Sequence, residues 1–382
     1  MITRLTALRA DELCDAATEV AATEGVEGLL VFVTDGGAAV VQDSLSTFRD
    51  FSVPVFGGVF PTLVHDGQTV EDGALVFGLP TRPTVTEVTD LSDPTADLSA
   101  QLDPSLLDTE NQTAFVFVDS YADRIGDMIR SLFDTYGVEF NFIGGGTGTL
   151  SDEEHPSLFT ESGLHTDAAV IATVPLSSSI GVNHGWKDID GPFRVTEADG
   201  TTMKSLDGEP AFQVYKRVLT SEADVDIDRA NFFETAKAYP FGLSRMGTEP
   251  IVRDPYTVNN DGSMECFGEI PTGEYVHILH GDSQELVDAA GAAATTAIDG
   301  PTDSTAGDNT DTSSSEEEAL LTFDCISRVL YLNDDFEREL EAIGANGHRL
   351  HGALSIGEVA NDGHGHLEYF NKTTVVASLS NE

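Results

Sequence analysis

The chain has 382 residues, of which 66 are acidic and 19 are basic, and its formal net charge is −47. This length is enough for two or three domains. So few cations cannot form a basic surface, which excludes nucleic acid and an anionic membrane as partners. Because counter-ions relieve the self-repulsion of such a chain, we expect a halophilic, acidic protein that works in a salt-rich cytoplasm.

The sequence shows neither a membrane anchor nor an export signal. It contains no apolar run of about 18 residues, and its first residues lack the apolar segment of a signal peptide. The cysteines Cys14, Cys266 and Cys325 lie far apart, which argues against a disulfide framework and a structural zinc site. We therefore expect a soluble, cytoplasmic protein without a metal or a cofactor.

One pattern of apolar segments occurs three times. Each copy has a first strand, a helix or a short connection, a second strand ending in glycine, and then antiparallel strands. The first strands are expected at 29–33, 114–118 and 320–323, the second at 53–56, 140–143 and 350–356, and the last at 74–79, 168–174 and 367–379. Helices are expected at 123–136 and 334–343, and a short connection in the first copy. Such units predict an α+β (mixed α/β) fold, with mixed sheets and flanking helices.

The stretch between the second and third copies is rich in strands. Strands are expected at 180–186, 193–198, 251–253, 264–270 and 275–280, and helices at 211–219 and 283–298. The segment 299–318 is polar and acidic, and we expect it to be a mobile surface excursion.

Two arginines are candidate anchors for an acidic ligand, because cations are scarce in this chain. Arg253 ends a strand, and Arg328 opens the segment after a core strand. Either guanidinium could hold a carboxylate through two hydrogen bonds. The alternative is that both arginines only neutralise neighbouring acids.

Four further residues of the third copy and its surroundings complete a candidate ligand site. The first strand of each copy ends near an acid, here Asp324, which Cys325 follows. Glu358 stands at the glycine end of the second strand, and Asn371 lies on the last strand. Since ligands bind beyond the carboxyl ends of parallel strands, we expect Asp324 and Cys325 to line the site. Glu358 and Asn371 would receive an amine or a hydroxyl.

Familiar cofactor motifs are incomplete in this sequence. The glycine run 144–148 lacks both the Gly-Lys-Ser/Thr of a phosphate loop and the last glycine of a dinucleotide motif. The segment 224–235 begins like a calcium loop but has Arg229 in place of glycine and Thr235 in place of glutamate. His364, His366 and Glu368 alternate as on one strand face, yet we identify no third tight ligand and predict no metal site.

Several short segments, in a fixed order, resemble the FIST family. They are 53–58, 184–186, 195–196, 207–211, 239–242, 252–254, 261–263, 323–328, 357–359 and 371–373. The resemblance implies an N-terminal sensory domain over 1–177 and a C-terminal one over 178–382. It implies a non-enzymatic sensor of intracellular signal transduction that binds a small polar metabolite such as an amino acid. The signal would pass to a kinase or another output protein acting in trans, since no output domain is recognisable.

Two other functions stay open at this point. A cysteine-dependent hydrolase or transferase would use Cys325, whose thiol pKa Arg328 could lower, but no histidine lies near it in sequence. A protein-interaction scaffold would use sheet edges or the acidic excursion to engage its partner.

Overall fold

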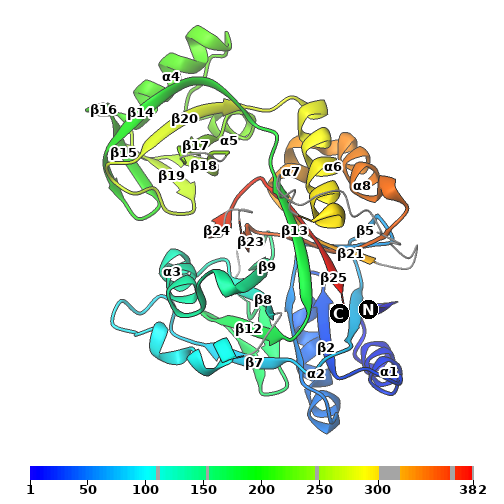
Figure 1. The fold of residues 1–382 in the computed structure, drawn as a ribbon. Coiled ribbons are helices and arrows are strands. Elements are labelled where there is room, and N and C mark those ends of the chain that lie inside the picture. Colours follow the sequence, from blue (N-terminus) through cyan, green and yellow to red (C-terminus); the bar gives the residue numbers. More distant parts are fainter. Residues whose placement is uncertain (109–111, 152–154, 246–248, 301–318, 362–365, 381–382) are drawn as a thin grey trace, which may run out of the picture.

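The structure is a computed structural model that describes residues 1–108, 112–151, 155–245, 249–300, 319–361 and 366–380. One unit occurs three times along the chain, and a separate sheet is inserted into the third unit (Figure 1). The acidic excursion predicted for 299–318 lies outside the described residues from residue 301 onward.

Each unit begins with an edge strand and continues with the first strand, a helix, the second strand, a hairpin and the last strand. The first unit consists of β1 (Ile2–Thr6), α1 (Ala10–Ala21), β2 (Gly28–Val33), α2 (Gly37–Asp50), β3 (Val55–Val59), β4 (Thr62–His65), β5 (Gln68–Val70) and β6 (Ala74–Leu79). The second consists of β7 (Thr84–Val88), β8 (Gln112–Asp119), α3 (Ile125–Tyr136), β9 (Phe140–Thr147), β10 (Leu158–Thr160), β11 (Gly163–His165) and β12 (Ala169–Val174), with short 3₁₀ turns at Ser99–Gln101, Pro104–Asp108 and Gly137–Glu139. The third consists of β13 (Ser177–Asn183), α6 (Ser283–Asp299), β21 (Ala319–Cys325), α7 (Ile326–Leu332), α8 (Phe336–Ile343), β22 (Arg349–Ser355), β23 (Glu358–Asn361), β24 (Leu367–Phe370) and β25 (Thr374–Ser380), with 3₁₀ turns at Asn333–Asp335 and Gly344–Asn346. The predicted α+β class, with repeated units and mixed sheets, is confirmed.

A seven-stranded sheet with two helices lies between β13 and α6. It contains β14 (Lys187–Asp199), β15 (Thr202–Leu206), β16 (Glu209–Pro210), α4 (Ala211–Glu222), α5 (Phe232–Ala236), β17 (Phe241–Leu243), β18 (Ile251–Val258), β19 (Met264–Phe267) and β20 (Tyr275–His280). We call it the inserted sheet. Figure 1 shows it as the green and yellow lobe that stands apart from the three other sheets and faces α3 and β24.

In every unit the first and second strands are parallel neighbours, and the last strand runs antiparallel beside the first. The predicted first strands 29–33, 114–118 and 320–323 are buried at every position, as their mainly apolar sequences require. The helix that joins first to second strand makes the parallel pairing possible, since a tight turn cannot connect parallel strands.

The units exchange their hairpins in a cycle. The β4–β5 hairpin of the first unit pairs with β22 of the third. The β10–β11 hairpin of the second unit pairs with β3 of the first, and the β23–β24 hairpin of the third pairs with β9 of the second. Two of these exchanges cross the predicted boundary between residues 177 and 178, so each half of the chain completes a sheet of the other.

Three equivalent glycines allow the parallel strands to lie close together. Gly57, Gly144 and Gly352 each face a residue of the first strand, in the same register in every unit. A Cβ atom on any of them would lie 1.7–1.9 Å from a carbonyl oxygen of the neighbouring first strand. These three glycines, which lie within the second strands, therefore have a packing role; Gly352 differs from Gly357, the glycine that follows the second strand in the third sequence copy.

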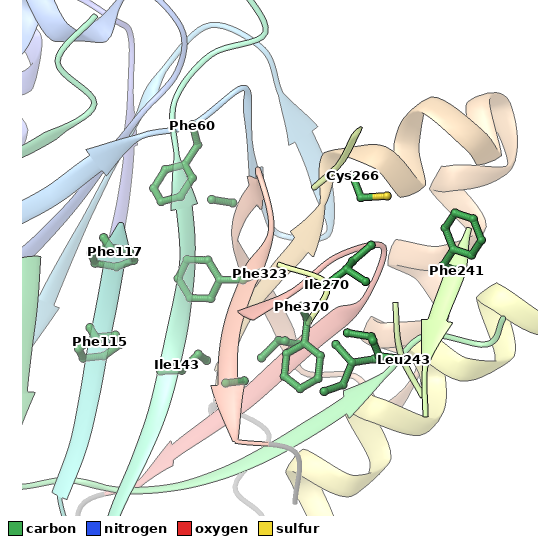
Figure 2. Close-up of a cluster of buried hydrophobic side chains, with 14 of the residues drawn as sticks. Phe60, Phe115, Phe117, Ile143, Phe241, Leu243, Cys266, Ile270, Phe323 and Phe370 are labelled. Atoms are coloured by element: carbon green, nitrogen blue, oxygen red, sulfur yellow. The ribbon is translucent and has the colours of Figure 1, made fainter. Parts of the chain in front are cut away.

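The three sheets meet at a cluster of phenylalanine rings. Phe32, Phe117 and Phe323 occupy equivalent positions on the three first strands, and their ring centroids are 5.5–5.8 Å apart. Phe60 packs against all three at 5.0–6.2 Å. Figure 2 shows Phe60, Phe117 and Phe323 gathered in this way. Each unit thus contributes one ring to a shared core, and edge-to-face pairs there add to the gain from burial.

Three sequence expectations differ from the structure. Helix α2 occupies the place of the short connection, because Val41, Leu45 and Phe48 form a buried stripe that the Gly, Ser and Thr content obscured. The expected strand 367–379 is two strands, separated by a turn in which Lys372 has a φ of 50°. The acids near the three strand ends are not equivalent. By the register of the parallel strands, the residue of the third unit that corresponds to Asp119 is Cys325, not Asp324.

A Gly57→Ala substitution tests whether the close approach of the first and second strands, which all three units share, depends on this glycine. The new Cβ would meet the Val31 carbonyl oxygen at 1.7 Å, and neither backbone can yield without breaking the parallel ladder. We expect the free energy of unfolding, measured by denaturant titration in molar KCl, to fall by about 3 kcal/mol or more. Gly344→Ala is the control, since nothing lies within 4 Å of its added Cβ. Equal stability of the two variants would contradict the assignment.

Candidate functional site

A cleft of about 830 Å³ opens between the second unit, the β24 strand and the inserted sheet. The second unit supplies the loop after β8 and the start of α3, with Tyr121 and Ile125. The inserted sheet supplies its face from β18 and β19, and Tyr369 of β24 closes the cleft between them. The cleft therefore has walls from both halves of the chain.

Arg253 of β18 is the buried cation of this cleft. Its side chain is 6% exposed, Nε donates to the Glu269 carbonyl at 2.9 Å, and Nη1 donates to the Val252 and Tyr369 carbonyls at 3.0 Å. Nη2 has no hydrogen-bond partner among the described residues. A Cβ on Gly268, whose φ is +82°, would come within 2.9 Å of the guanidinium, so this glycine leaves space for it. Arg253 is held in place and keeps donor capacity for a ligand.

Further charges surround Arg253 along the cleft. Arg245 lies 3.4 Å from the Glu368 carboxylate, and Arg130 lies 3.0 Å from the Glu269 carboxylate. Burial lowers the pKa of Arg253, whereas the Glu368 charge acts in the opposite direction. Arginine keeps its charge at any ordinary pH. Three of the 14 arginines therefore line one cleft of a strongly acidic protein.

Tyr369 separates the cleft from a buried polar cluster. Its hydroxyl donates to the Ile356 carbonyl. A Cβ atom on Gly357 would clash with the Tyr369 ring, so this glycine leaves space for the ring. Burial and the Glu358 carboxylate raise the pKa of Tyr369 well above its usual range. The Tyr369 hydroxyl thus stays protonated, and the ring forms part of the cleft wall.

Cys325 and Glu358 lie buried behind Tyr369. The thiol of Cys325 hydrogen-bonds to Glu358, and the Ser355 hydroxyl donates to the same carboxyl group at 3.0 Å. Burial and the Glu358 charge raise the pKa of Cys325 to about 12. Burial and the Asp324 charge raise the pKa of Glu358 well above its usual range. A nucleophilic cysteine needs the opposite shift, so this environment favours a neutral, structural thiol.

Arg328 is completely buried, and all five of its N–H groups are engaged. Two of them hold the Glu339 carboxylate at 2.7 and 2.8 Å. The others donate to the carbonyls of His184, Lys372 and Leu286 at 2.7–3.1 Å and thereby fill the remaining capacity of the guanidinium. With no donor left for a ligand, Arg328 joins elements of the fold.

Asp324 lies beside this ion pair. One carboxylate oxygen is 3.4 Å from Arg328 Nε and accepts from the Thr374 hydroxyl at 3.3 Å. The other oxygen has no hydrogen-bond partner among the described residues. Burial and the Glu339 charge raise the pKa of Asp324 well above its usual range. This shift favours the protonated form of Asp324 beside the Arg328–Glu339 ion pair.

Lys372, which our sequence interpretation did not single out as a site residue, ties the inserted sheet to the third unit. Its ammonium group donates to the Lys237 carbonyl at 3.0 Å and lies 3.2 Å from Asp254 and 5.2 Å from the Trp186 ring centre. The neighbouring Asn371 is 4% exposed, and its Oδ1 has no hydrogen-bond partner among the described residues. These contacts fix the turn that leads away from Tyr369.

Of the six site residues predicted from the sequence, the structure places Arg253 on the cleft. Asp324, Cys325, Arg328 and Glu358 form a connected buried cluster, and Asn371 is buried in the turn after β24. The cleft residues that the sequence interpretation missed are Tyr121, Arg130, Arg245, Tyr256, Phe267, Glu368 and Tyr369. The scarcity of cations, which pointed to Arg253, would also have pointed to Arg130 and Arg245.

Breaking the Arg328 ion pair should destabilise the protein strongly. Arg328→Met leaves the Glu339 and Asp324 carboxyl groups buried without a counter-charge, and such losses cost about 3–5 kcal/mol. The check is denaturant unfolding in molar KCl. Arg338→Met removes an arginine whose ion pair with Asp335 is half-exposed, so it should cost less than about 1 kcal/mol. Similar losses for both variants would show that the Arg328 network is not a stabilising core.

His184 should make stability depend on pH. Its Nδ1 accepts from the Trp186 N–H at 2.9 Å and its Nε2 donates to the Pro250 carbonyl at 3.0 Å, which together require the neutral ring. Burial lowers the pKa of His184 to about 3. A lowered pKa in the folded state contributes stability above pH 6.5 that is lost as the pH falls toward 3.

The measurement is the free energy of unfolding between pH 6.5 and pH 4, for wild type and for His184→Gln. We expect a shallower slope in the variant, by up to about 1.4 kcal/mol per pH unit. His351, whose burial lowers its pKa to about 4, is present in both proteins and cancels in the difference. Parallel slopes would refute the assignment.

Two models of known protein families match this chain. A family model described as FIST N domain matches residues 29–209, and one described as FIST C domain matches residues 211–361. No curated protein matches the chain in a sequence search. No described helix combines the length and the apolar character needed to cross a bilayer. Because the two matches cover most of the sequence, the chain belongs to the FIST family.

Proposed function

We propose that this protein is a cytoplasmic, salt-adapted sensor that binds a small carboxylate-bearing metabolite in the cleft beside Arg253. The FIST family is associated with sensory roles in signal transduction and with small ligands, and it is not known as an enzyme family. The ligand proposed here is amino-acid-like, and its signal passes to a separate output protein such as a kinase.

The free donor group of Arg253 is the observation that carries this proposal. Three of its N–H contacts go to carbonyls of its own surroundings, and they fix the direction of Nη2. A nearly buried guanidinium with an uncommitted nitrogen, at the wall of a cleft, suits a small anionic group such as a carboxylate. Because the holding contacts are to main-chain atoms, the anchor is preorganised and loses little entropy on binding.

Acidic side chains near the arginines suit the other end of an amino-acid-like ligand. Glu368 and Glu269 line the same cleft and are only partly buried, so they can receive an ammonium group. Glu358 and Asn371, which the sequence suggested for this task, lie outside the cleft lining. We propose that these two residues, with Asp324, Cys325 and Arg328, support the wall behind Tyr369 and do not touch the ligand.

The position of the cleft suggests how binding becomes a signal. One wall belongs to the inserted sheet and the other to α3 and the loop after β8. A ligand that contacts both walls stabilises the arrangement in which the two walls lie closer together. The surface of the inserted sheet and of α3 would then present a different face to the output protein.

The two rival functions receive less support. The raised pKa and the burial of Cys325 disfavour a cysteine-dependent hydrolase or transferase. A scaffold without a ligand would not need the preorganised Arg253. A scaffold role would be favoured if no small molecule raises the unfolding temperature.

The test is thermal unfolding in molar KCl with a panel of amino acids, organic acids and nucleotides. A ligand at about 100 times its dissociation constant should stabilise the protein by about 2.7 kcal/mol. We expect carboxylates to act, Arg253→Gln to abolish the shift, and Arg253→Lys to weaken it, because lysine keeps the charge but cannot make the three carbonyl contacts that hold the free nitrogen in position.

Arg217→Gln is the matched control, since Arg217 lies on α4 in an exposed ion pair with Glu209, outside the cleft lining. It should respond to the ligand like wild type. Circular dichroism must show that the Arg253 variants are folded. Full response of folded Arg253→Gln would sink the proposed site.

A further inference from the structure

Two histidines and an aspartate meet where the exchanged hairpin of the first unit joins the sheet of the third. In the antiparallel pairing of β4 with β22, His65 stands directly opposite His351. Asp66 follows at the turn between β4 and β5, with a φ of 48°. Residues from the beginning and the end of the chain are thus brought together by the hairpin exchange and by nothing local in sequence.

The ligand atoms of these three side chains converge on one point. All lie within 4.8 Å of one another, with His65 Nε2 at 3.4 Å from Asp66 Oδ2 and His351 Nε2 at 3.6 Å from Asp66 Oδ1. Ligand atoms of a tetrahedral ion with bonds of 2.0–2.1 Å are about 3.4 Å apart. The two ring centroids are 4.9 Å apart, so the imidazoles lie side by side.

The histidines also carry unsatisfied ring nitrogens. His351 is completely buried, and neither its Nε2 nor the Nδ1 of His65 has a hydrogen-bond partner among the described residues. Leaving a buried polar atom without a partner is costly, and its presence in a fold calls for an explanation. A bound ion at His351 Nε2 supplies the missing partner.

We propose that His65, Asp66 and His351 bind a divalent transition-metal ion of the zinc class, which fastens the exchanged hairpin to the sheet of the third unit. Two imidazoles and one carboxylate form a mixed nitrogen and oxygen set that suits zinc rather than calcium or magnesium. A water molecule completes the coordination, because the Asp66 side chain is half-exposed and borders a surface cavity of about 440 Å³.

The surroundings of His351 favour the neutral ring, which is the form that binds a metal. Burial, together with His65, Arg349 and the N-terminal amine, lowers the pKa of His351 to about 4, against the Asp66 charge. His351 is therefore neutral at pH 7, as a ligand must be. When the ion binds Nε2, the ring proton moves to Nδ1, and only the long 3.4 Å contact from the Asp66 N–H is given up.

The experiment is metal binding by the full chain after dialysis against a chelator, in molar KCl to suppress non-specific binding to the acidic surface. We expect one equivalent of Zn²⁺ to raise the unfolding temperature and one equivalent of Co²⁺ to give the intense visible bands of a tetrahedral site. His65→Gln and Asp66→Asn, which alter half-buried and exposed positions, should bind at least about 100-fold more weakly. His351→Gln should do the same if it folds.

The matched control is His277→Gln. His277 also lies beside an aspartate, 3.1 Å from Asp188, but in the inserted sheet and without a second histidine. It should bind like wild type. The proposal is overturned if folded wild type binds no more Co²⁺ than Asp66→Asn, or if the spectrum is the weak one of octahedral carboxylate and water ligation. The ligand site beside Arg253 is unaffected by either result.

Discussion

The buried guanidinium of Arg328 is the contact on which the third unit depends. Its five N–H groups connect α7, which carries it, to α8 through Glu339, to α6 through Leu286, to the segment after β13 through His184, and to the turn after β24 through Lys372. Taking such a charge out of water is offset only when every donor is used and the counter-charge is close. That requirement fixes the relative positions of five segments. It also fixes the turn after β24 through the Lys372 carbonyl, and with that turn the position of Tyr369 in the cleft wall.

The three units have the same strand order, yet they differ in what they add to it. Their shared features are the close glycine, the ring on the first strand and the exchanged hairpin, all of which serve packing. The third unit alone carries the inserted sheet, and the cleft lies where that sheet faces the second unit. The proposed ligand site therefore lies at an addition to the repeat, where two units meet, and not at the strand ends that all three units share.

The sequence predicted the units well because their first strands are unbroken apolar runs and their second strands end in glycine. The sequence also led us to predict a ligand site at Asp324, Cys325, Arg328 and Glu358, and there is a physical reason for that prediction. A carboxylate, a thiol and an arginine at strand ends look the same in sequence whether they face a ligand or one another. In the structure Glu339 takes two donors of Arg328, and for this reason the proposed ligand site does not include the cluster. Arg253 was identified by the scarcity of cations, whereas Tyr369 and Glu368 reach the cleft through a hairpin exchange that no periodicity records. The same exchange brings His65 to His351.

The cyclic exchange of hairpins has a consequence for how the chain reaches its fold. Asp66 and His351 touch across 285 positions of sequence, and no unit can complete its sheet from its own strands. Topologies dominated by such distant pairings have high contact order and fold slowly. Until their partner hairpins are made, β3 and β9 keep open edges that can pair with other chains. For a protein made from its N-terminus, β4 and β5 must wait for a partner strand synthesised almost at the end. The high net charge makes incomplete chains repel one another and so aids their assembly.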